Sequence, residues 1–353
     1  MYASERALLA DMIDYAGLFP PARLSLSASI GNYVRYRRES EGWMLARFVC
    51  PVGALGELAP YLDELFNEEP PWRLCVLGRG GDTDAAFLDN LRLDLEAVKQ
   101  FREQHQARAV VECVELRLPA GTAGPDGHRS APRLLAKARE AFEAAQLTTL
   151  PRFYELPLTG DYRRTAKIVT HALSMLNRGR TPGARPAEDT RSPVENASRL
   201  KRNPADAKTR IHDYAGLKLR CGGLEPAAVP SVEQVATVIE ESAGARVPLK
   251  FTAGLHHPTR QLDPCLGVFV HGFLNVFSAA ILADALGLNY PDIVAVVEEE
   301  DPRQFRFSEE SFAWSDAEVT VKEIEHARRF QAVSFGSCSF DEPRSELKEI
   351  GLL

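Results

Sequence analysis

Two strand-like runs, GLKLRCG at 216–222 and PLKFTAG at 248–254, frame a segment that contains the capping-box sequence SVEQ at 231–234. A capping box marks the first turn of a helix, so this segment predicts a strand, a helix and a second strand. A connection of this kind joins parallel strands by a right-handed crossover. We therefore expect a parallel sheet in this part of the chain.

The same alternation extends over the rest of the sequence. Further candidate strands lie at 14–19, 44–52, 73–78, 109–116, 152–158 and 330–336. Periodic, helix-like stretches lie between most of them, as at 55–66, 87–104 and 133–146. Eight strand–helix units predict an α/β fold that closes as a (β/α)8 TIM-type barrel, with residues 1–353 forming one domain. An open doubly wound sheet is the alternative, but no GxGxxG turn follows an early strand, which disfavours a dinucleotide-binding version.

Helix ends and irregular segments refine this expectation. SDAE at 315–318 has the form of a second capping box, and Gly287 stands where a C-terminal glycine cap belongs. Residues 177–211 are rich in Arg, Pro and Ala and predict a mobile loop or insertion. Residues 289–314 contain FRF and FAW on either side of SEES and predict a small added hairpin.

Composition limits the function classes. The chain has 353 residues, 45% apolar and 26% charged, and a net charge of -7, which disfavours a general binder of nucleic acid or anionic membranes. The first residues lack the basic-then-apolar order of a signal peptide, and the apolar stretch 266–288 is interrupted by polar residues, which indicates a buried helix. The six cysteines form no CxxC pair, as expected for buried thiols in a reducing cytoplasm.

Alternation within two strands assigns polar side chains to the barrel interior. Lys218 and Arg220 share one face of their strand, and Lys250, Thr252 and Gly254 share one face of the next. If the strands are neighbours, two lysines lie close together, and repulsion with burial would disfavour their charged forms. A neutral lysine can attack a carbonyl.

Carboxylates on other strands leave a second interpretation open. Glu115, Glu155 or Asp14 could neutralise the lysines in an ionic barrel core. Glu115 and Glu155 are also the candidates for proton transfer, with pKa values that burial would raise and nearby cations would lower.

The two lysine strands, GLKLRCGG and LKFTAGL, each have a glycine four positions after the lysine, and the last strand runs into SFGSCS. In these features the last third of the chain resembles class I aldolases of the deoxyribose-phosphate aldolase type. The resemblance implies a (β/α)8 barrel in which Lys218 forms a Schiff base and Lys250 lowers its pKa. It also implies an anion site, made by Gly254, Gly336, Ser337 and Ser339. Arg220 and the histidines depart from that family's pattern.

His256 and His257 follow the second lysine strand and precede Pro258, so we expect them in a loop at the active end of the barrel. Either one could contact substrate, shuttle a proton or, with a strand glutamate, bind a divalent metal. Adjacent histidines cannot easily bind one ion as a pair, and no HxH or HExxH spacing accompanies them.

These observations predict a cytoplasmic enzyme that acts on a small anionic carbonyl compound or sugar phosphate, by lyase or aldolase chemistry through a Lys218 imine and without a required cofactor. Arg220 would bind the substrate anion. One alternative is a metal-dependent lyase or hydrolase that uses His256, His257 and the strand glutamates. Another is a non-catalytic ligand-binding barrel with 177–211 as a partner-binding loop. The chain could also form a homo-oligomer.

Overall fold

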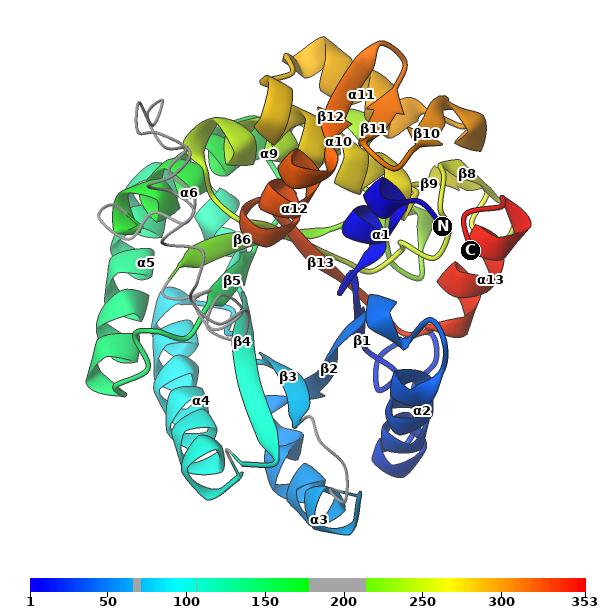
Figure 1. Ribbon diagram of the computed structural model, residues 1–353. Helices are drawn as coiled ribbons and strands as arrows, with labels where there is room; N and C mark the ends of the chain where they lie inside the picture. Colours follow the sequence, from blue (N-terminus) through cyan, green and yellow to red (C-terminus); the bar gives the residue numbers. More distant parts are fainter. Residues whose placement is uncertain (66–70, 106, 178–213) are drawn as a thin grey trace, which may run out of the picture.

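Eight parallel strands close into a barrel in the computed structural model, which describes residues 1–65, 71–105, 107–177 and 214–353 (Figure 1). The strand order around the barrel is β1-β13-β7-β6-β5-β4-β3-β2. The strands are β1 (Ile13–Tyr15), β2 (Leu45–Pro51), β3 (Trp72–Leu77), β4 (Ala109–Arg117), β5 (Arg152–Glu155), β6 (Ala215–Arg220), β7 (Leu249–Thr252) and β13 (Ala332–Ser337). The predicted TIM-type barrel is confirmed, and each predicted strand corresponds to one of these eight.

Helices surround the barrel and connect its strands (Figure 1). They are α1 (Ala3–Leu9), α2 (Leu26–Arg38), α3 (Leu55–Leu65), α4 (Asp84–His105), α5 (Gly127–Ala144), α6 (Tyr162–Leu176), α9 (Val232–Ala245), α10 (Phe273–Leu286), α11 (Tyr290–Glu298), α12 (Val321–Phe330) and α13 (Asp341–Glu349). The helices predicted at 55–66, 87–104 and 133–146 are α3, α4 and α5.

Two of the three predicted helix ends are confirmed. Ser231 caps α9 in a capping box with Gln234, and Gly287 ends α10 in the left-handed conformation, with φ of 69°. The box predicted at 315–318 is wrong, because these residues form a turn and enter strand β12 (Ala317–Thr320). The capping box of α12 lies at Thr320, whose side chain accepts a hydrogen bond from the backbone of Glu323.

The region 289–314 holds more than the predicted hairpin. Strands β10 (Phe305–Phe307) and β11 (Ser311–Trp314) are antiparallel as expected, but β12 extends them to a three-stranded sheet and α11 precedes them. A second small sheet, β8 (Gln261–Asp263) and β9 (Val268–Val270), follows β7. The apolar stretch 266–288 therefore begins with a strand before it enters the buried helix α10. The insertion predicted at 177–211 lies, apart from Asn177, outside the described residues.

Two apolar clusters fill the molecule. The larger one packs the strands against the surrounding helices. The smaller one lies inside the barrel and is formed by Val49, Cys75, Cys113, Phe153 and Tyr214. Charged side chains, among them Arg47 and Lys250, also lie in the interior. None of the helices in the described ranges is long and apolar enough to cross a membrane.

An irregularity in β4 brings extra polarity into the barrel. Leu74 of β3 pairs with Val111, but the next residue, Cys75, pairs with Cys113, so Glu112 is an extra residue in β4. Such a bulge lets two consecutive side chains approach the same face. Here Glu112 contacts an interior arginine while Cys113 contacts an interior lysine.

Candidate functional site

Lys218 of β6 and Lys250 of β7 lie side by side in the barrel interior. They are register partners in the parallel pair β6–β7, so their side chains leave the sheet at the same level. Lys218 is 4% exposed and Lys250 is 0% exposed. The sequence-based assignment of both lysines to the interior is therefore confirmed.

Glu115 of β4 bridges the two lysines. Its Oε2 lies 2.7 Å from the Nζ of Lys218, and its Oε1 lies 2.5 Å from the Nζ of Lys250. Lys218 also contacts Oε2 of Glu155 at 3.0 Å, and Lys250 contacts Oδ2 of Asp14 at 2.7 Å. The structure thus brings together Lys218, Lys250, Glu115 and Glu155, the four predicted catalytic residues, together with Asp14.

Further ion pairs extend this cluster in both directions. Toward the N-terminal ends of the strands, Asp14 contacts Arg47 at 3.2 Å, and Arg47 contacts Glu112 at 2.8 Å. Glu112 contacts Arg73 at 2.8 Å, and Arg73 contacts Asp11 at 2.5 Å.

Toward the C-terminal ends, Glu155 contacts Arg220 at 3.3 Å. The resulting interior ion chain alternates in charge, and its ten members in order are Asp11, Arg73, Glu112, Arg47, Asp14, Lys250, Glu115, Lys218, Glu155 and Arg220.

The carboxylates reverse the expected effect on the lysines. Burial alone would lower the pKa of Lys218, but the attraction of Glu115 and Glu155 outweighs it and raises the pKa above the usual lysine range. Burial likewise opposes the charge on Lys250, and Asp14 with the other neighbouring acidic groups raises the pKa well above that range. The prediction that Lys250 lowers the pKa of Lys218 is wrong, because each ammonium group has two carboxylates within 3.0 Å. Both lysines are charged at neutral pH.

Several members of the interior ion chain, and two cysteines that contact it, were not among the predicted site residues. Arg47 lies in the apolar run MLARFVCPV and Arg73 lies in RLCVLG, which is the same signal that identified the lysines. Cys75 and Cys113 lie 3.5 Å and 3.7 Å from the Nζ of Lys250, where alternation along β3 and β4 would have placed them. The contribution of Glu112 depends on the bulge in β4, which the sequence did not reveal.

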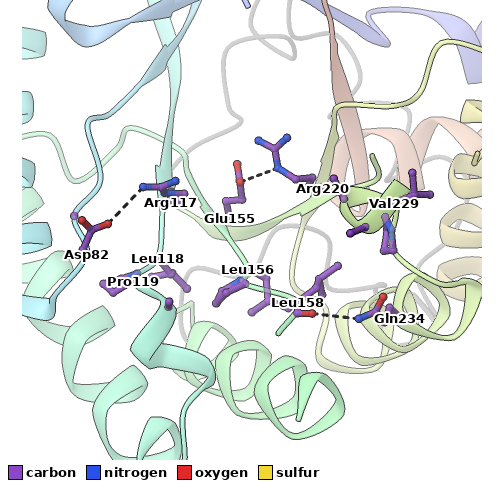
Figure 2. A pocket seen from close by; sticks show the side chains of 16 residues that line it. Asp82, Arg117, Leu118, Pro119, Glu155, Leu156, Leu158, Arg220, Val229 and Gln234 are labelled. Atoms are coloured by element: carbon purple, nitrogen blue, oxygen red, sulfur yellow. Dashed lines mark hydrogen bonds and ion pairs between the residues drawn. The ribbon is translucent and has the colours of Figure 1, made fainter. Parts of the chain in front are cut away.

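A pocket of about 350 Å³ opens at the C-terminal ends of β4, β5 and β6 (Figure 2). We call it the mouth pocket. Its side-chain charges belong to Asp82, Arg117, Glu155 and Arg220. Active sites of TIM-barrel enzymes lie at this end of the barrel. Glu155 and Arg220 are the two predicted site residues that line the mouth pocket, and Arg117 was missed although it lies two residues after Glu115, on the same strand face.

The two arginines of the mouth pocket have largely exposed side chains, and their contacts are long. The side chain of Arg220 is 48% exposed, and it contacts Glu155 at 3.3 Å and the carbonyl oxygen of Gly222 at 3.5 Å. The side chain of Arg117 is 63% exposed, and its ion pair with Asp82 measures 3.8 Å. Figure 2 shows Arg117 and Arg220 on opposite sides of Glu155.

The two glycines predicted to bind an anion instead allow neighbouring strands to pack closely. Gly254 has φ of +73°, and a Cβ there would lie 2.6 Å from the Cα of Gly222. A Cβ on Gly336 would lie 3.0 Å from the Oγ1 of Thr252. These close contacts bring β6, β7 and β13 together. None of the four residues predicted to bind an anion, Gly254, Gly336, Ser337 and Ser339, lines the mouth pocket.

The two serines form a turn. The hydroxyl of Ser337 donates to the carbonyl oxygen of Ser339 at 2.6 Å, and the Oγ of Ser339 accepts from the backbone N–H of Glu342 at 3.1 Å. Both hydroxyls therefore hold the connection between β13 and α13. The geometry does not support the predicted anion site, because these groups are engaged with the turn and the first turn of α13 carries Asp341 and Glu342.

The adjacent histidines bind the C-terminal helix. The Nδ1 of His256 lies 2.7 Å from Glu342, and the Nδ1 of His257 lies 2.6 Å from Glu346, one turn further along α13. Neither histidine lines the mouth pocket. Within the described ranges, no three His, Cys, Asp or Glu side chains are grouped so that they could hold a metal ion. The metal site predicted from these histidines and the strand glutamates is therefore not assembled.

No family model matches the chain, and no curated protein matches it. The barrel and the residues of its mouth are accordingly the basis for a functional assignment.

Proposed function

We propose that this chain is an enzyme that binds a small anionic carbonyl compound in the mouth pocket and acts on it by lyase or aldolase chemistry. The observation that carries the proposal is the position of Glu155. This carboxylate belongs to the interior ion chain through Lys218 and also lines the pocket between two arginines. An acid or base must be in reach of the substrate while its protonation state is controlled by its surroundings.

The protonation state of Glu155 is controlled by the two cations beside it. Burial would raise the pKa of its carboxyl group, but the attraction of Lys218 and Arg220 outweighs burial and holds the pKa below its usual range. Glu155 is therefore ionised at neutral pH. Its basicity would increase when a substrate anion draws Arg220 away, because one of the two cations that stabilise the carboxylate is then shared with the ligand.

The proposed reaction is the cleavage of a β-hydroxycarbonyl compound. Glu155 takes the proton of the hydroxyl group, and the electron pair left on that oxygen forms the C=O bond of an aldehyde or ketone product. The C–C bond to the carbonyl-bearing fragment breaks at the same time, and its electron pair forms an enolate on that fragment. The protonated Glu155 then returns the proton to the enolate carbon, so that atoms and charge balance. Arginine at the pocket wall would stabilise the negative charge as it develops.

Proton exchange tests this proposal with a panel of candidate substrates. Carboxylated and phosphorylated ketones and β-hydroxyketones are incubated with the enzyme in D2O, and deuterium incorporation beside the carbonyl group is followed by NMR. We expect exchange with the unaltered protein and a rate about 10²- to 10⁴-fold lower for Glu155→Gln. Glu349→Gln, at the far end of α13, is the matched control and should keep the full rate. Equal rates for Glu155→Gln and the unaltered protein would contradict the assignment.

A Lys218 imine is the second candidate, because the Nζ of Lys218 lies directly behind Glu155, at 3.0 Å from its carboxylate. Imine formation requires the ammonium to lose a proton, and Glu115 and Glu155 are the acceptors within reach. The raised pKa of Lys218 means that this route should accelerate as pH rises into the alkaline range, whereas the Glu155 route should be flat through neutral pH.

Borohydride trapping separates the two routes. Reduction in the presence of the carbonyl panel, followed by peptide mass spectrometry, would place an adduct on Lys218 if the imine forms. Lys218→Arg keeps the positive charge and should abolish such an adduct. Deuterium exchange without any adduct would favour the Glu155 route alone.

A further inference from the structure

We propose that the ligand of the mouth pocket carries two anionic groups, one bound by Arg117 and one by Arg220, with its reacting carbon between them and opposite Glu155. This inference rests on the proposed function, since it names the substrate class of the same pocket. It is drawn from the placement of three side chains on three neighbouring strands.

The strand register separates the two arginines. Arg117 of β4 is the register partner of Glu155 of β5, and Glu155 is the partner of Lys218, two residues before Arg220 on β6. Neighbouring strands lie about 4.8 Å apart and a strand rises about 3.3 Å per residue, so the backbone positions of the two arginines are separated by about 12 Å with Glu155 between them. Figure 2 shows the same order across the pocket.

Both arginines can exchange their present partners for a ligand. The ion pair of Arg117 at 3.8 Å joins it to Asp82, whose side chain is 100% exposed. The contacts of Arg220 at 3.3 Å and 3.5 Å are also long. Exposed ion pairs contribute little, and a guanidinium group has five N–H donors that match the oxygens of a carboxylate or phosphate.

One anion shared by both arginines is the less favourable arrangement. A single anionic group midway between them would lie against the carboxylate of Glu155 and be repelled by it. Two anionic groups, one at each side, keep their charges away from Glu155. They also leave the neutral carbon chain beside the residue that moves the proton.

The rest of the pocket fits a short connecting chain. Leu118, Pro119, Leu156, Leu158 and Val229 contribute apolar surface, and the volume of about 350 Å³ admits a small molecule. We therefore expect a carbon chain of a few atoms with a carboxylate at one end and a carboxylate or phosphate at the other.

Titration calorimetry with defined anions tests this inference. The probes are malonate, succinate and glutarate as dicarboxylates, 3-phosphonopropionate as the phosphorus analogue, and propionate and butyrate as single anions. We expect one of the dianions to bind about 10- to 100-fold more tightly than either single anion, which corresponds to one added charged hydrogen-bonded pair. Tighter binding of the phosphonate than of the dicarboxylates would identify a phosphate-bearing ligand, and the reverse would identify a dicarboxylate.

Arginine variants assign the two ends. Arg117→Met and Arg220→Met should each remove the advantage of the dianion and leave the single anions within a few-fold of their original affinity. Arg303→Met is the matched control, because that arginine is 87% exposed and lies outside the pocket. Equal binding of single anions and dianions, or a dianion affinity unchanged in Arg117→Met, would overturn the inference.

Binding and turnover can fail independently. Dianion binding that depends on both arginines, without deuterium exchange on any carbonyl compound, would keep this inference and remove the proposed function. Exchange that depends on Glu155 with no preference for dianions would do the opposite.

Discussion

The centre of the interior ion chain and its end at the mouth pocket are built from the same kinds of side chain but behave differently. At its centre, Asp14 and Lys250 are 0% exposed, and each contacts at least two oppositely charged groups. At its C-terminal end, Arg220 is 48% exposed and contacts one carboxylate at 3.3 Å. At the centre, Asp14 and Lys250 are each already paired with at least two opposite charges. At the mouth pocket, the guanidinium group of Arg220 still has N–H donors that can bind a ligand.

This difference separates charge that stabilises the fold from charge that is available to a ligand. A buried charge whose partners are all in place has nothing left with which to bind a ligand, and removing one partner leaves another charge uncompensated. A half-exposed charge with long contacts contributes little to stability and can be recruited by an anion. The comparison predicts large stability effects at the centre and small ones at the mouth.

The largest effect is expected for Lys250→Met. This change leaves Asp14 and Glu115 each short of one cation in a dry interior, which should lower the free energy of unfolding by about 3–5 kcal/mol. Arg220→Met should lower it by less than about 1 kcal/mol. Urea unfolding followed by circular dichroism measures both.

A paired change tests the cause of that loss. Asp14→Leu combined with Lys250→Met leaves Arg47 with Glu112 and Lys218 with Glu115. We expect the double variant to be more stable than the sum of its single variants predicts. Additive losses would mean that shape, and not charge balance, governs the centre.

Two glycines with similar φ separate backbone strain from close packing between β6 and β7. Gly287→Ala should cost about 1–2 kcal/mol, because its φ of +69° is strained for alanine but no atom lies within 4 Å of the new Cβ. Gly254→Ala has a similar φ and also brings a Cβ to 2.6 Å from the Cα of Gly222, so it should cost about 1–3 kcal/mol more. Thermal unfolding of both variants measures the difference, and equal losses would show that β6 and β7 can move apart.

Acid should weaken the centre selectively. Burial opposes the ionised forms of Asp14 and Glu115, but their cations outweigh burial and lower both pKa values. A carboxyl group with a lowered pKa stabilises the fold above its unfolded pKa of about 4 and loses that contribution as pH falls through its folded pKa. Each unit of lowering is equivalent to about 1.4 kcal/mol. Urea unfolding between pH 3 and 8 should show a loss below about pH 4, and this loss should be smaller in Lys250→Met.

The smallest effect is expected at the histidine contacts of α13. His256 and His257 pair with Glu342 and Glu346 in partly exposed positions. His256→Gln and His257→Gln should each change the free energy of unfolding by less than about 1 kcal/mol. A double-mutant cycle with Glu342→Gln isolates the first pair. A coupling energy above about 2 kcal/mol would mean that this pair contributes as much to stability as the buried ion pairs at the centre of the ion chain.

The sequence predicted the eight strands and the inward lysines because side chains alternate strictly along a strand. Lys218, Lys250, Glu115 and Glu155 meet for that reason. The sequence left the direction of the lysine pKa shifts open between mutual repulsion and neutralisation by carboxylates, because it depends on how many carboxylates reach each ammonium group across the barrel. Arg47 and Arg117 were available to the same reasoning and were missed.

The partners of the histidines could not be inferred from local patterns. His256 and Glu342 are 86 positions apart, and their contact depends on how α13 returns along the end of the barrel. The role of Ser337 and Ser339 could not be inferred from the local pattern either, because the same small residues can bind an anion or form a tight turn. Only the direction taken by the chain after β13 distinguishes the two.

The bulge in β4 has a consequence for how this barrel tolerates insertions and deletions. Glu112 is the extra residue opposite the Leu74–Cys75 step, so removing it would restore regular pairing without turning Cys113 or Glu115 to the other side of the sheet. A one-residue deletion at most other positions of β4 would reverse the facing of every residue beyond it. Position 112 is therefore where this strand can change length by one residue at the expense of a single link, the carboxylate between Arg47 and Arg73.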